Sequence, residues 1–553
     1  MIMDPDAWGI DQLRAEIARR GAAAGRAREL PVDYYRIGYR LSWPLPITAR
    51  PQDFPAPIPG IPTYPWLVWI GWGLEERWAA LHNAGATETV LRELAALAGW
   101  STFVDDSDQA GLITASIALW LTRGLDAADG PARAELAGIA DRLITESLLP
   151  RYRRERTEPP ADDLRRLQNI RLIPLFTAGR LAAVLDHPAL PEVRELADQA
   201  VSLWVRLRRD AGYTEGVGYD GYLTEHLLEW LAVAPDQEAS DEIRQAALSW
   251  PATAVPGRPE VQVPFGDIEP EMTQWLTVVA AVAATEPGLA AWCRTVPLRA
   301  FPSAALARML AWPETAGTAA PKPAITGVRQ PGAVALRTVD QGLVGEVLVA
   351  VATPRVEVGH LHHDAGQVIL GWRGRTWISD PGYQQYRAGA EQDFTLDHGA
   401  HNAPVIDGAG QTRRGAVLAA LSATEAVVDL GGCYPESGGP LRRTVRLDED
   451  TVLIRDDLAG ATEVITHWLA AGDLHWQFVD GWARLSVDDQ EEALWFGCSS
   501  TNLSARWLGR HPGSRGQLTL TVPTTTERTD WVLVLDPSAG WQPPSKSILE
   551  KRS

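Results

Sequence analysis

The hydrophobic periodicity of this chain changes once, and that change constrains the fold more than any other feature of the sequence. Up to about residue 312, apolar residues recur at three- and four-residue spacing, as in QAGLITASIALWLTRGL and EVRELADQAVSLWVRLRRD, which is the spacing of amphipathic helices. From about residue 333, short alternating runs such as QVILGWRG and RRTVRLDEDTVLIRDDL are separated by turn residues, as strands are. The chain therefore predicts a helical region followed by a large antiparallel β-sandwich.

These patterns divide the chain into four regions. Residues 1–85 combine a short amphipathic start with a Pro- and Trp-rich segment, and because closely spaced prolines prevent long helices, we expect an extended arm packed on a larger body. Residues 86–312 form the helical domain, 313–332 a linker rich in Pro, Ala, Gly and Thr, and 333–553 the sandwich. Helical segments of near-constant length favour antiparallel hairpins that curve into a toroid. The expected fold class is α+β and multidomain: an N-terminal incomplete (α/α) toroid followed by a C-terminal antiparallel β-sandwich.

Composition excludes several classes of protein. A net charge of −19 argues against a duplex nucleic-acid binder, and any anionic substrate must meet a locally basic site. The acidic N-terminus lacks the features of a secretory signal and no apolar run is long enough to span a bilayer, so we expect a cytoplasmic protein with no membrane partner. Cys293, Cys433 and Cys498 are too few and too far apart for a disulfide framework or a thiolate zinc cluster. A homo-oligomer is compatible with the sequence.

Five of the eleven histidines lie in one stretch of the sandwich region. If GHLHHDAG is a strand, His360, His362 and Asp364 face one side, because alternate residues of a strand do so. Asp380 ends the expected strand RTWISD, and His401 follows in a further turn or strand. Two imidazoles and a carboxylate suit a tetrahedral Zn²⁺ site with one position left for water or another ligand.

Three motifs in this stretch, GHLHHDAG, WISDPGY and AHNAPVIDGAGQ, resemble the C-terminal domain of the heparinase II/III-like polysaccharide lyases, a family that includes relatives acting on alginate. The resemblance implies an incomplete toroid joined to a β-sandwich, in the order of helices and strands already expected. It implies a catalytic role for His360. It also implies that His362, Asp380 and His401 bind a zinc ion that organises the sandwich rather than performing the chemistry. Tyr386, after the DPG turn, is a candidate to bind substrate.

Two segments of the helical region resemble the other half of the family's site. The stretch RRDAGYTEGVGYDGYLTEH is similar to one in which a tyrosine faces the substrate; Tyr219 and Tyr222 are the candidates, Tyr219 is preferred, and Glu215 is a supporting, substrate-binding residue. The helix LQNIRLIPLFTAGRLAAV resembles the one whose asparagine neutralises the substrate carboxylate, which falls on Asn169. Ile170 stands where a histidine often follows, which removes one candidate acid or base.

Two further features have open interpretations. Arg166 and Arg171 belong to an Arg-rich run beside Asn169 and are candidates to bind an anionic substrate, although a run of charge is more often a solvated helix face. The loop PFGDIEP resembles a G-D loop of the family, and because the sequence offers it no partner, we expect a structural role.

The resemblance implies a lyase that cleaves a uronate-containing oligo- or polysaccharide by β-elimination. Asn169 would neutralise the carboxylate, Tyr219 would transfer the proton and His360 would assist as base or acid. One alternative is the same scaffold recruited to a small-molecule elimination or dehydration in biosynthesis, which Ile170 favours. A second is a cupin-like metalloenzyme using Fe²⁺ or Mn²⁺, although the glutamate usual after the second histidine of G-x-H-x-H is missing. A third is a carbohydrate-binding protein without catalytic activity.

Overall fold

The structure, a computed structural model, describes residues 8–34, 37–43, 63–100, 103, 111–157, 162–268, 272–312, 327–338, 345–357, 360–382, 390–435, 441–448, 450–459, 461, 463–487, 492–499, 506–507, 518–524 and 528–536. The chain divides into two compact units. The helical unit comprises Met1–Leu207, Tyr219–Gln245 and Thr273–Thr318. The sheet unit comprises Arg208–Gly218, Ala246–Met272 and Ala319–Ser553, so two segments from the expected helical domain group with the strands.

The N-terminal arm is only partly extended. After α1 (Ile10–Arg26), the antiparallel hairpin of β1 (Glu29–Tyr34) and β2 (Ile37–Ser42) is indeed extended. The expectation that prolines prevent a long helix is wrong for α2 (Thr63–Asn83). Pro65 stands in the first turn of that helix, where its missing N–H would have no helical partner anyway. Residues 44–62, with most of the arm's prolines, lie outside the described residues.

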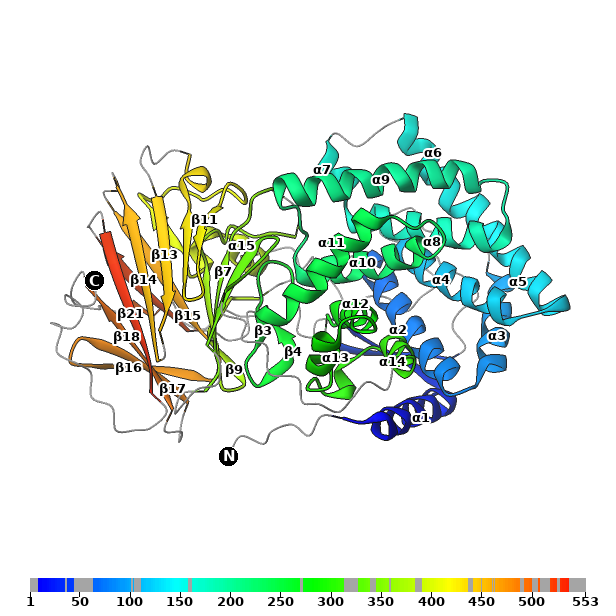
Figure 1. The fold of residues 1–553 in the computed structure, drawn as a ribbon, viewed down its shortest axis with the longest axis horizontal. Coiled ribbons are helices and arrows are strands. Elements are labelled where there is room, and N and C mark those ends of the chain that lie inside the picture. Colours follow the sequence, from blue (N-terminus) through cyan, green and yellow to red (C-terminus); the bar gives the residue numbers. More distant parts are fainter. Residues whose placement is uncertain are drawn as a thin grey trace. The chain divides into compact units, whose positions relative to one another are not determined.

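Several helices of the helical unit are largely buried, and two of them contact each other. α4 (Gly111–Ala127) and α8 (Asn169–Leu185) are buried over most of their circumference, and α4 contacts both α2 and α8 (Figure 1). A helix that is apolar on all sides must be covered by other elements, which explains this placement. The other described helices are α3 (Thr87–Ala95), α5 (Gly130–Arg142), η4 (a π-helix, Leu143–Leu148), α6 (Leu149–Thr157), α7 (Asp163–Arg166), α9 (Leu190–Ala211), α10 (Val217–Leu231), α11 (Gln237–Ser249), α12 (Gln274–Ala283), α13 (Pro287–Cys293) and α14 (Ser303–Leu310).

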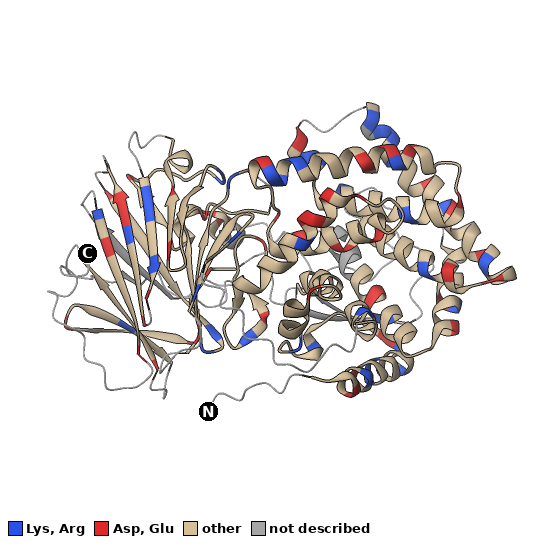
Figure 2. Ribbon diagram, viewed as in Figure 1, with Lys and Arg blue, Asp and Glu red and all other residues tan. Residues whose placement is uncertain are grey.

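The Arg-rich run is matched by acidic side chains. Figure 2 shows basic and acidic residues interspersed along α9. Arg153 and Arg156 of α6 pair with Glu192 of α9 at 3.0 and 3.3 Å. The two arginine side chains are 59% and 47% exposed, as expected for a solvated helix face.

The sheet unit is an antiparallel sandwich (Figure 1). One sheet has the strand order β19-β20-β15-β9-β8-β7-β6-β5, with β10 paired to β15; the other has the order β11-β12-β13-β14-β21-β18-β17-β16. The core between them takes alternate residues of facing strands, such as Val349 and Val351 from one sheet and Val452 and Ile454 from the other. A helical region followed by an antiparallel sandwich is therefore confirmed.

The strands have the following bounds: β5 (Gly327–Gln330), β6 (Ala333–Arg337), β7 (Val347–Ala352), β8 (Val368–Trp372), β9 (Arg375–Ile378), β10 (Pro404–Ile406), β11 (Val417–Leu421), β12 (Glu425–Asp429), β13 (Leu441–Leu447), β14 (Thr451–Leu458), β15 (Val464–Ala470), β16 (Leu474–Val479), β17 (Trp482–Val487), β18 (Ala493–Cys498), β19 (Arg506–Trp507), β20 (Leu518–Thr524) and β21 (Arg528–Asp536). The helix α15 (Ala390–Leu396) precedes β10. β5 begins inside the expected linker, whose residues 313–326 lie outside the described residues.

A small hairpin extends the sandwich. β3 (Ala254–Val255) and β4 (Arg258–Gln262) pair with each other, and neighbouring Ala252 and Val263 share an apolar cluster with residues of β6, β7 and β8. The guanidinium of Arg337 on β6 donates to the carbonyl of Ala252 at 2.9 Å. The hairpin thereby fixes the start of the loop that follows it, residues 263–268, against the sheet unit. Among the described residues, no helix combines the length and apolarity needed to cross a membrane.

Candidate metal centre and its histidine loop

The segment that carries the histidines is a loop, so the expected strand at GHLHHDAG is wrong. β8 begins only at Val368, and a turn closed by the Gln367 N–H donating to the Asp364 carbonyl at 2.8 Å precedes it. Gly366 has a positive φ of 75°, and a Cβ there would lie 2.9 Å from Leu430. The alternation argument therefore does not apply, and contacts with other segments orient the side chains.

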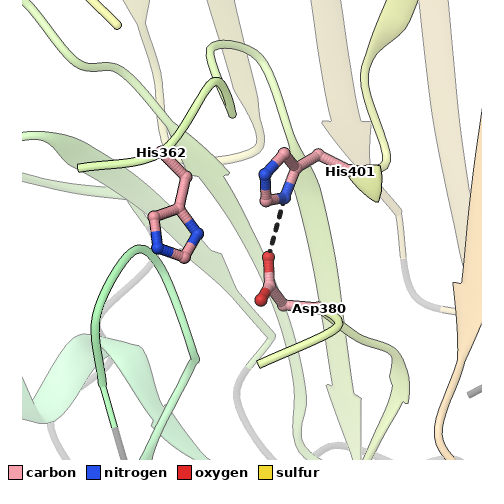
Figure 3. A group of neighbouring side chains, drawn as sticks. All are labelled: His362, Asp380 and His401. Atoms are coloured by element: carbon pink, nitrogen blue, oxygen red, sulfur yellow. Dashed lines mark hydrogen bonds and ion pairs between the residues drawn. The ribbon is translucent and has the colours of Figure 1, made fainter. Parts of the chain in front are cut away.

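His362, Asp380 and His401 converge at the end of β9 (Figure 3). One ligand atom of each residue lies within 4.8 Å of the others, and all three side chains are fully buried. The Nδ1–H of His401 donates to Asp380 Oδ2 at 3.0 Å. The same carboxylate accepts from the Gln367 side-chain amide at 2.7 Å and from the Gly382 backbone N–H at 2.8 Å. The structure thus brings together the three residues expected to bind metal.

These residues fit a divalent metal ion. Within the described part of the chain, His362 Nδ1 and His401 Nε2 are buried and have no hydrogen-bond partner. Leaving a buried polar atom unsatisfied typically costs about 1–3 kcal/mol, which coordination to a metal would offset. Two imidazole nitrogens and a carboxylate are the donor set that zinc accepts.

A carboxylate from the loop after the β3/β4 hairpin contacts two of the histidines. Asp267 Oδ2 lies 3.0 Å from His360 Nδ1, and Asp267 Oδ1 lies 2.8 Å from His362 Nε2. The Asp267 backbone N–H also donates to the His360 carbonyl at 3.0 Å. Gly266 makes this approach possible, because its φ is 66° and a Cβ there would lie 2.4 Å from the His360 carbonyl oxygen. The G-D loop therefore has the partner that the sequence did not offer.

Electrostatics keep Asp267 ionised. Burial raises the pKa of this carboxyl, but hydrogen bonds from His360 and His362 outweigh it, and the pKa is lowered overall. For His360, burial lowers the pKa, but the bond to Asp267 and the charge of Glu215 outweigh burial, so the pKa is raised overall. For His362, burial also lowers the pKa, but the bond to Asp267 and the charges of Asp267, Asp380 and Asp364 raise it overall. Since Asp267 is a carboxylate, each histidine donates to it.

The turn that carries His401 is held by buried polar side chains. The Asn402 side chain donates to the Val368 carbonyl at 2.9 Å and accepts from the Leu469 N–H at 2.7 Å. Arg443, fully buried, donates to the carbonyls of Asn402 at 2.8 Å and Gly366 at 2.7 Å, and it pairs with buried Asp456. One guanidinium thus connects the histidine loop to the His401 turn, which keeps the metal-site residues in register.

Residues 332–548 match the family model described as "Heparinase II/III-like, C-terminal". The sheet unit carries a heparinase II/III-like C-terminal domain. The resemblance inferred from the histidine motifs is confirmed by this match. No curated protein sequence matches the chain.

Solved lyase structures share the fold of the whole chain. A heparinase III gene product has a TM-score of 0.58 at 12% identity, covering 97% of this chain and 85% of its own. The heparan sulfate lyase HepC from Pedobacter heparinus has a TM-score of 0.55 at 12% identity, covering 98% and 87%. The chondroitin AC lyase of Streptomyces coelicolor A3 in complex with chondroitin sulphate has a TM-score of 0.50 at 14% identity, covering 99% and 81%. The fold class of a toroid followed by a sandwich is confirmed.

The other candidate site residues of the sheet unit, which carries the heparinase II/III-like domain, differ in their surroundings. Glu215 is 1% exposed, and its charge acts on His360. Asp364, which the strand interpretation grouped with His360, is buried, and burial raises its pKa against the opposing charges of His401 and His362. His363 turns away and donates from Nδ1 to the Gln411 carbonyl. Tyr386 lies outside the described residues.

In the helical unit, the two tyrosines of α10 differ in their surroundings. The Tyr222 ring meets Trp72 edge-on at 5.3 Å between centroids and His226 at 5.1 Å. Burial and the charge of Glu75 raise the Tyr222 pKa well above its usual value. Tyr219 is 8% exposed, against 2% for Tyr222. Both tyrosines are buried, and the choice of Tyr219 as the residue that carries the proton stays a prediction.

The polar candidates near α8 are also distinct from one another. Asn169 is the first residue of α8 and is 1% exposed. Arg166 is exposed and lies 3.5 Å from Asp163. Arg171 is half-buried, and its carbonyl accepts from the Tyr152 hydroxyl. Of these, Arg166 has the surroundings of a solvated ion pair rather than of a substrate ligand.

Proposed function

We propose that this protein is a polysaccharide lyase that cleaves a uronate-containing saccharide by β-elimination. The observation that carries the proposal is the arrangement of His360, whose Nδ1 is held by Asp267 beside the buried His362, Asp380 and His401 cluster. A heparinase II/III-like domain supports it, as do neighbours of the same fold named as lyases of heparan sulfate and chondroitin.

The reaction sets three chemical tasks. The C5 proton of the uronate passes to a base, its electron pair forms the C4–C5 double bond, and the C4–O bond breaks as that oxygen takes up a proton. The negative charge that builds up on the carboxylate group has to be stabilised, which hydrogen-bond donors achieve most effectively when they are preorganised. General acid or base transfer by one side chain typically contributes about 10²–10⁴-fold.

The side chains are assigned to these tasks by their chemistry and surroundings. Asn169 donates its amide N–H to the carboxylate, and Tyr219 transfers the proton to the leaving oxygen. His360 acts as base or acid through Nε2, because Nδ1 is engaged with Asp267. Glu215 supports the charge of His360. Arg171, Tyr386 and Arg166 are assigned to substrate binding. Of these, Arg166 is exposed and already pairs with Asp163.

The metal cluster has a supporting role in this proposal. His362, Asp380 and His401 would hold zinc, which when bound supplies a fixed positive charge and a cross-link between three chain segments. This cross-link would help to fix the position of His360, which stands two residues before His362. The chain's own residues perform the proton transfers.

The test is the appearance of an unsaturated uronate. Purified zinc-loaded protein is incubated with heparosan, hyaluronan, alginate and glucuronan oligosaccharides, and the short-wavelength ultraviolet absorbance of the conjugated product is followed. A rise that the His360→Ala and Tyr219→Phe variants abolish supports β-elimination and identifies the sugar. Absence of a rise with every saccharide contradicts the proposal.

A second candidate function is an elimination or dehydration of a small molecule on the same scaffold. Ile170, half-buried next to Asn169 on α8, favours it, because a polar acid or base is absent from that position. This function predicts a folded, zinc-binding protein that is inactive on all of the saccharides above.

A further inference from the structure

Asp267 uses both carboxylate oxygens, one on each of two histidines with different roles. Oδ2 accepts from Nδ1 of His360, and Oδ1 accepts from Nε2 of His362. Asp267 precedes His360 by 93 positions and His362 by 95 positions in the sequence. Its side chain is only 9% exposed. One carboxylate therefore connects the proposed base to the proposed metal ligand.

We propose that Asp267 is a positioning residue that sets the ring tautomers of His360 and His362, and so couples metal binding to catalysis. The catalytic half of this inference rests on the proposed function, whereas the half that concerns metal binding does not.

The tautomers follow from the chemistry of the imidazole ring. A neutral imidazole carries one N–H, and the nitrogen that donates it to a carboxylate leaves the lone pair on the other nitrogen. His362 gives Nε2–H to Asp267, so its lone pair lies on Nδ1, the buried nitrogen that has no hydrogen-bond partner among the described residues. His360 gives Nδ1–H to Asp267, so its lone pair lies on Nε2, which can accept a proton. The two rings are thus oriented in opposite senses by one group.

A carboxylate is required because both contacts need an acceptor. An asparagine has one acceptor oxygen and one donor NH₂, so at position 267 it could satisfy only one of the two imidazole N–H groups. Its NH₂ would face a nitrogen that should carry a proton, and it would stabilise the wrong tautomer there. Groups that orient a metal-binding histidine in this way typically affect metal affinity by about 10–100-fold when removed.

The first experiment measures zinc affinity by competition with a chromophoric chelator. We compare the wild-type chain with Asp267→Asn, with His401→Ala as a variant lacking a ligand, and with Asp536→Asn as a control. Asp536 is 4% exposed at the end of β21, in the other sheet, so it tests the loss of a buried carboxylate as such. Asp267→Asn should bind zinc about 10–100-fold more weakly, and on an active substrate its kcat should fall more than its KM changes. Zinc affinity equal to that of Asp536→Asn overturns the inference.

A second measurement needs no variant at position 267 and therefore remains decisive if Asp267→Asn does not fold. Zinc-free protein with ¹⁵N-labelled histidine is examined by long-range ¹H–¹⁵N correlation NMR at about pH 9, well above the usual histidine pKa of about 6.5. His360 should be protonated at Nδ1 and His362 at Nε2, with the two signals assigned by His360→Gln and His362→Gln. The opposite tautomer in either ring overturns the inference.

The two proposals can fail separately. If wild-type protein acts on no saccharide, the lyase proposal fails, while zinc affinity and the tautomers still decide the role of Asp267 in orienting the rings. If the protein is an active lyase and Asp267→Asn keeps its zinc affinity, the role of Asp267 alone fails.

Discussion

His401 donates Nδ1–H to Asp380 Oδ2 at 3.0 Å, while its Nε2 is buried and has no hydrogen-bond partner in the described part of the chain. One ligand atom from each of His401, His362 and Asp380 lies within 4.8 Å of the others, close enough for the three residues to hold one ion. Because most buried polar atoms are hydrogen-bonded, the unsatisfied nitrogen together with the clustered ligand atoms supports a metal site here.

We predict that His401→Ala loses both zinc and thermal stability. A ligand present at about 100 times its Kd stabilises the folded state by about 2.7 kcal/mol, and the variant loses that contribution together with the bond to Asp380. Zinc content by elemental analysis and the melting temperature with and without chelator provide the test. The chelator should lower the melting temperature of the wild type and leave that of His401→Ala unchanged. A chelator effect of equal size on both proteins would exclude this triad as the zinc site.

We predict that His360→Ala keeps its zinc and loses turnover. His360 is not one of the three clustered ligands, and removing a general acid or base typically lowers kcat by about 10²–10⁴-fold. His363→Ala is a matched control in the same loop, because that ring donates to the Gln411 carbonyl instead. If His360→Ala releases zinc as His401→Ala does, the division into catalytic and metal-binding histidines is wrong.

The residues of the metal cluster could be expected from the sequence because each stands in a local motif. His362, Asp380 and His401 are marked by H-x-H, by a DPG turn and by an HN pair, and turn chemistry is a local property. The order of helices and strands was accessible for the same reason, since hydrophobic periodicity reports local burial.

Other features could not be predicted from the sequence because they depend on tertiary contacts. The histidine segment is a loop, since its polar groups are satisfied by Asp267 and Gln411 rather than by a neighbouring strand. Asp267 stands 95 residues before His362, and although PFGDIEP resembles a G-D loop of the family, nothing local in the sequence gives its partner. α2 forms beyond the prolines expected to prevent it, because Pro65 occupies a first turn.

We predict that Tyr219→Phe and Tyr222→Phe differ sharply in activity. If Tyr219 carries the proton, removing its hydroxyl should lower kcat by about 10²–10⁴-fold. Tyr222→Phe keeps the edge-on ring contacts with Trp72 and His226, so its kcat should change by no more than a few-fold. The test is the initial rate of each variant on whichever saccharide the absorbance assay finds to be cleaved. Wild-type rates in both variants would remove the helical unit from the proposed proton transfer.

A buried acidic cluster in the helical unit should make stability depend on pH. Burial, reinforced by the charge of Glu75, raises the pKa of Glu225 to about 8, and burial raises the pKa of Glu75 to about 7. In the unfolded chain both groups titrate near 4.5. Between these values the folded state holds protons that the unfolded state has released, so the free energy of unfolding falls as pH rises from about 4.5 to about 8.

We predict that Glu225→Gln weakens this dependence, because glutamine cannot lose a proton in that window. Melting temperatures of wild type and variant, measured from about pH 6 to about pH 9, should converge or cross as pH rises, with the variant relatively more stable at the alkaline end. Glu192→Gln is the control: that carboxyl is hydrogen-bonded to Arg153, which lowers its pKa and keeps it ionised throughout the window. Parallel curves for wild type and Glu225→Gln would contradict the prediction, because they would show that Glu225 is already ionised in the folded protein at neutral pH. Arg123 and Arg308, whose charges lower this pKa, would then compensate for the burial of Glu225.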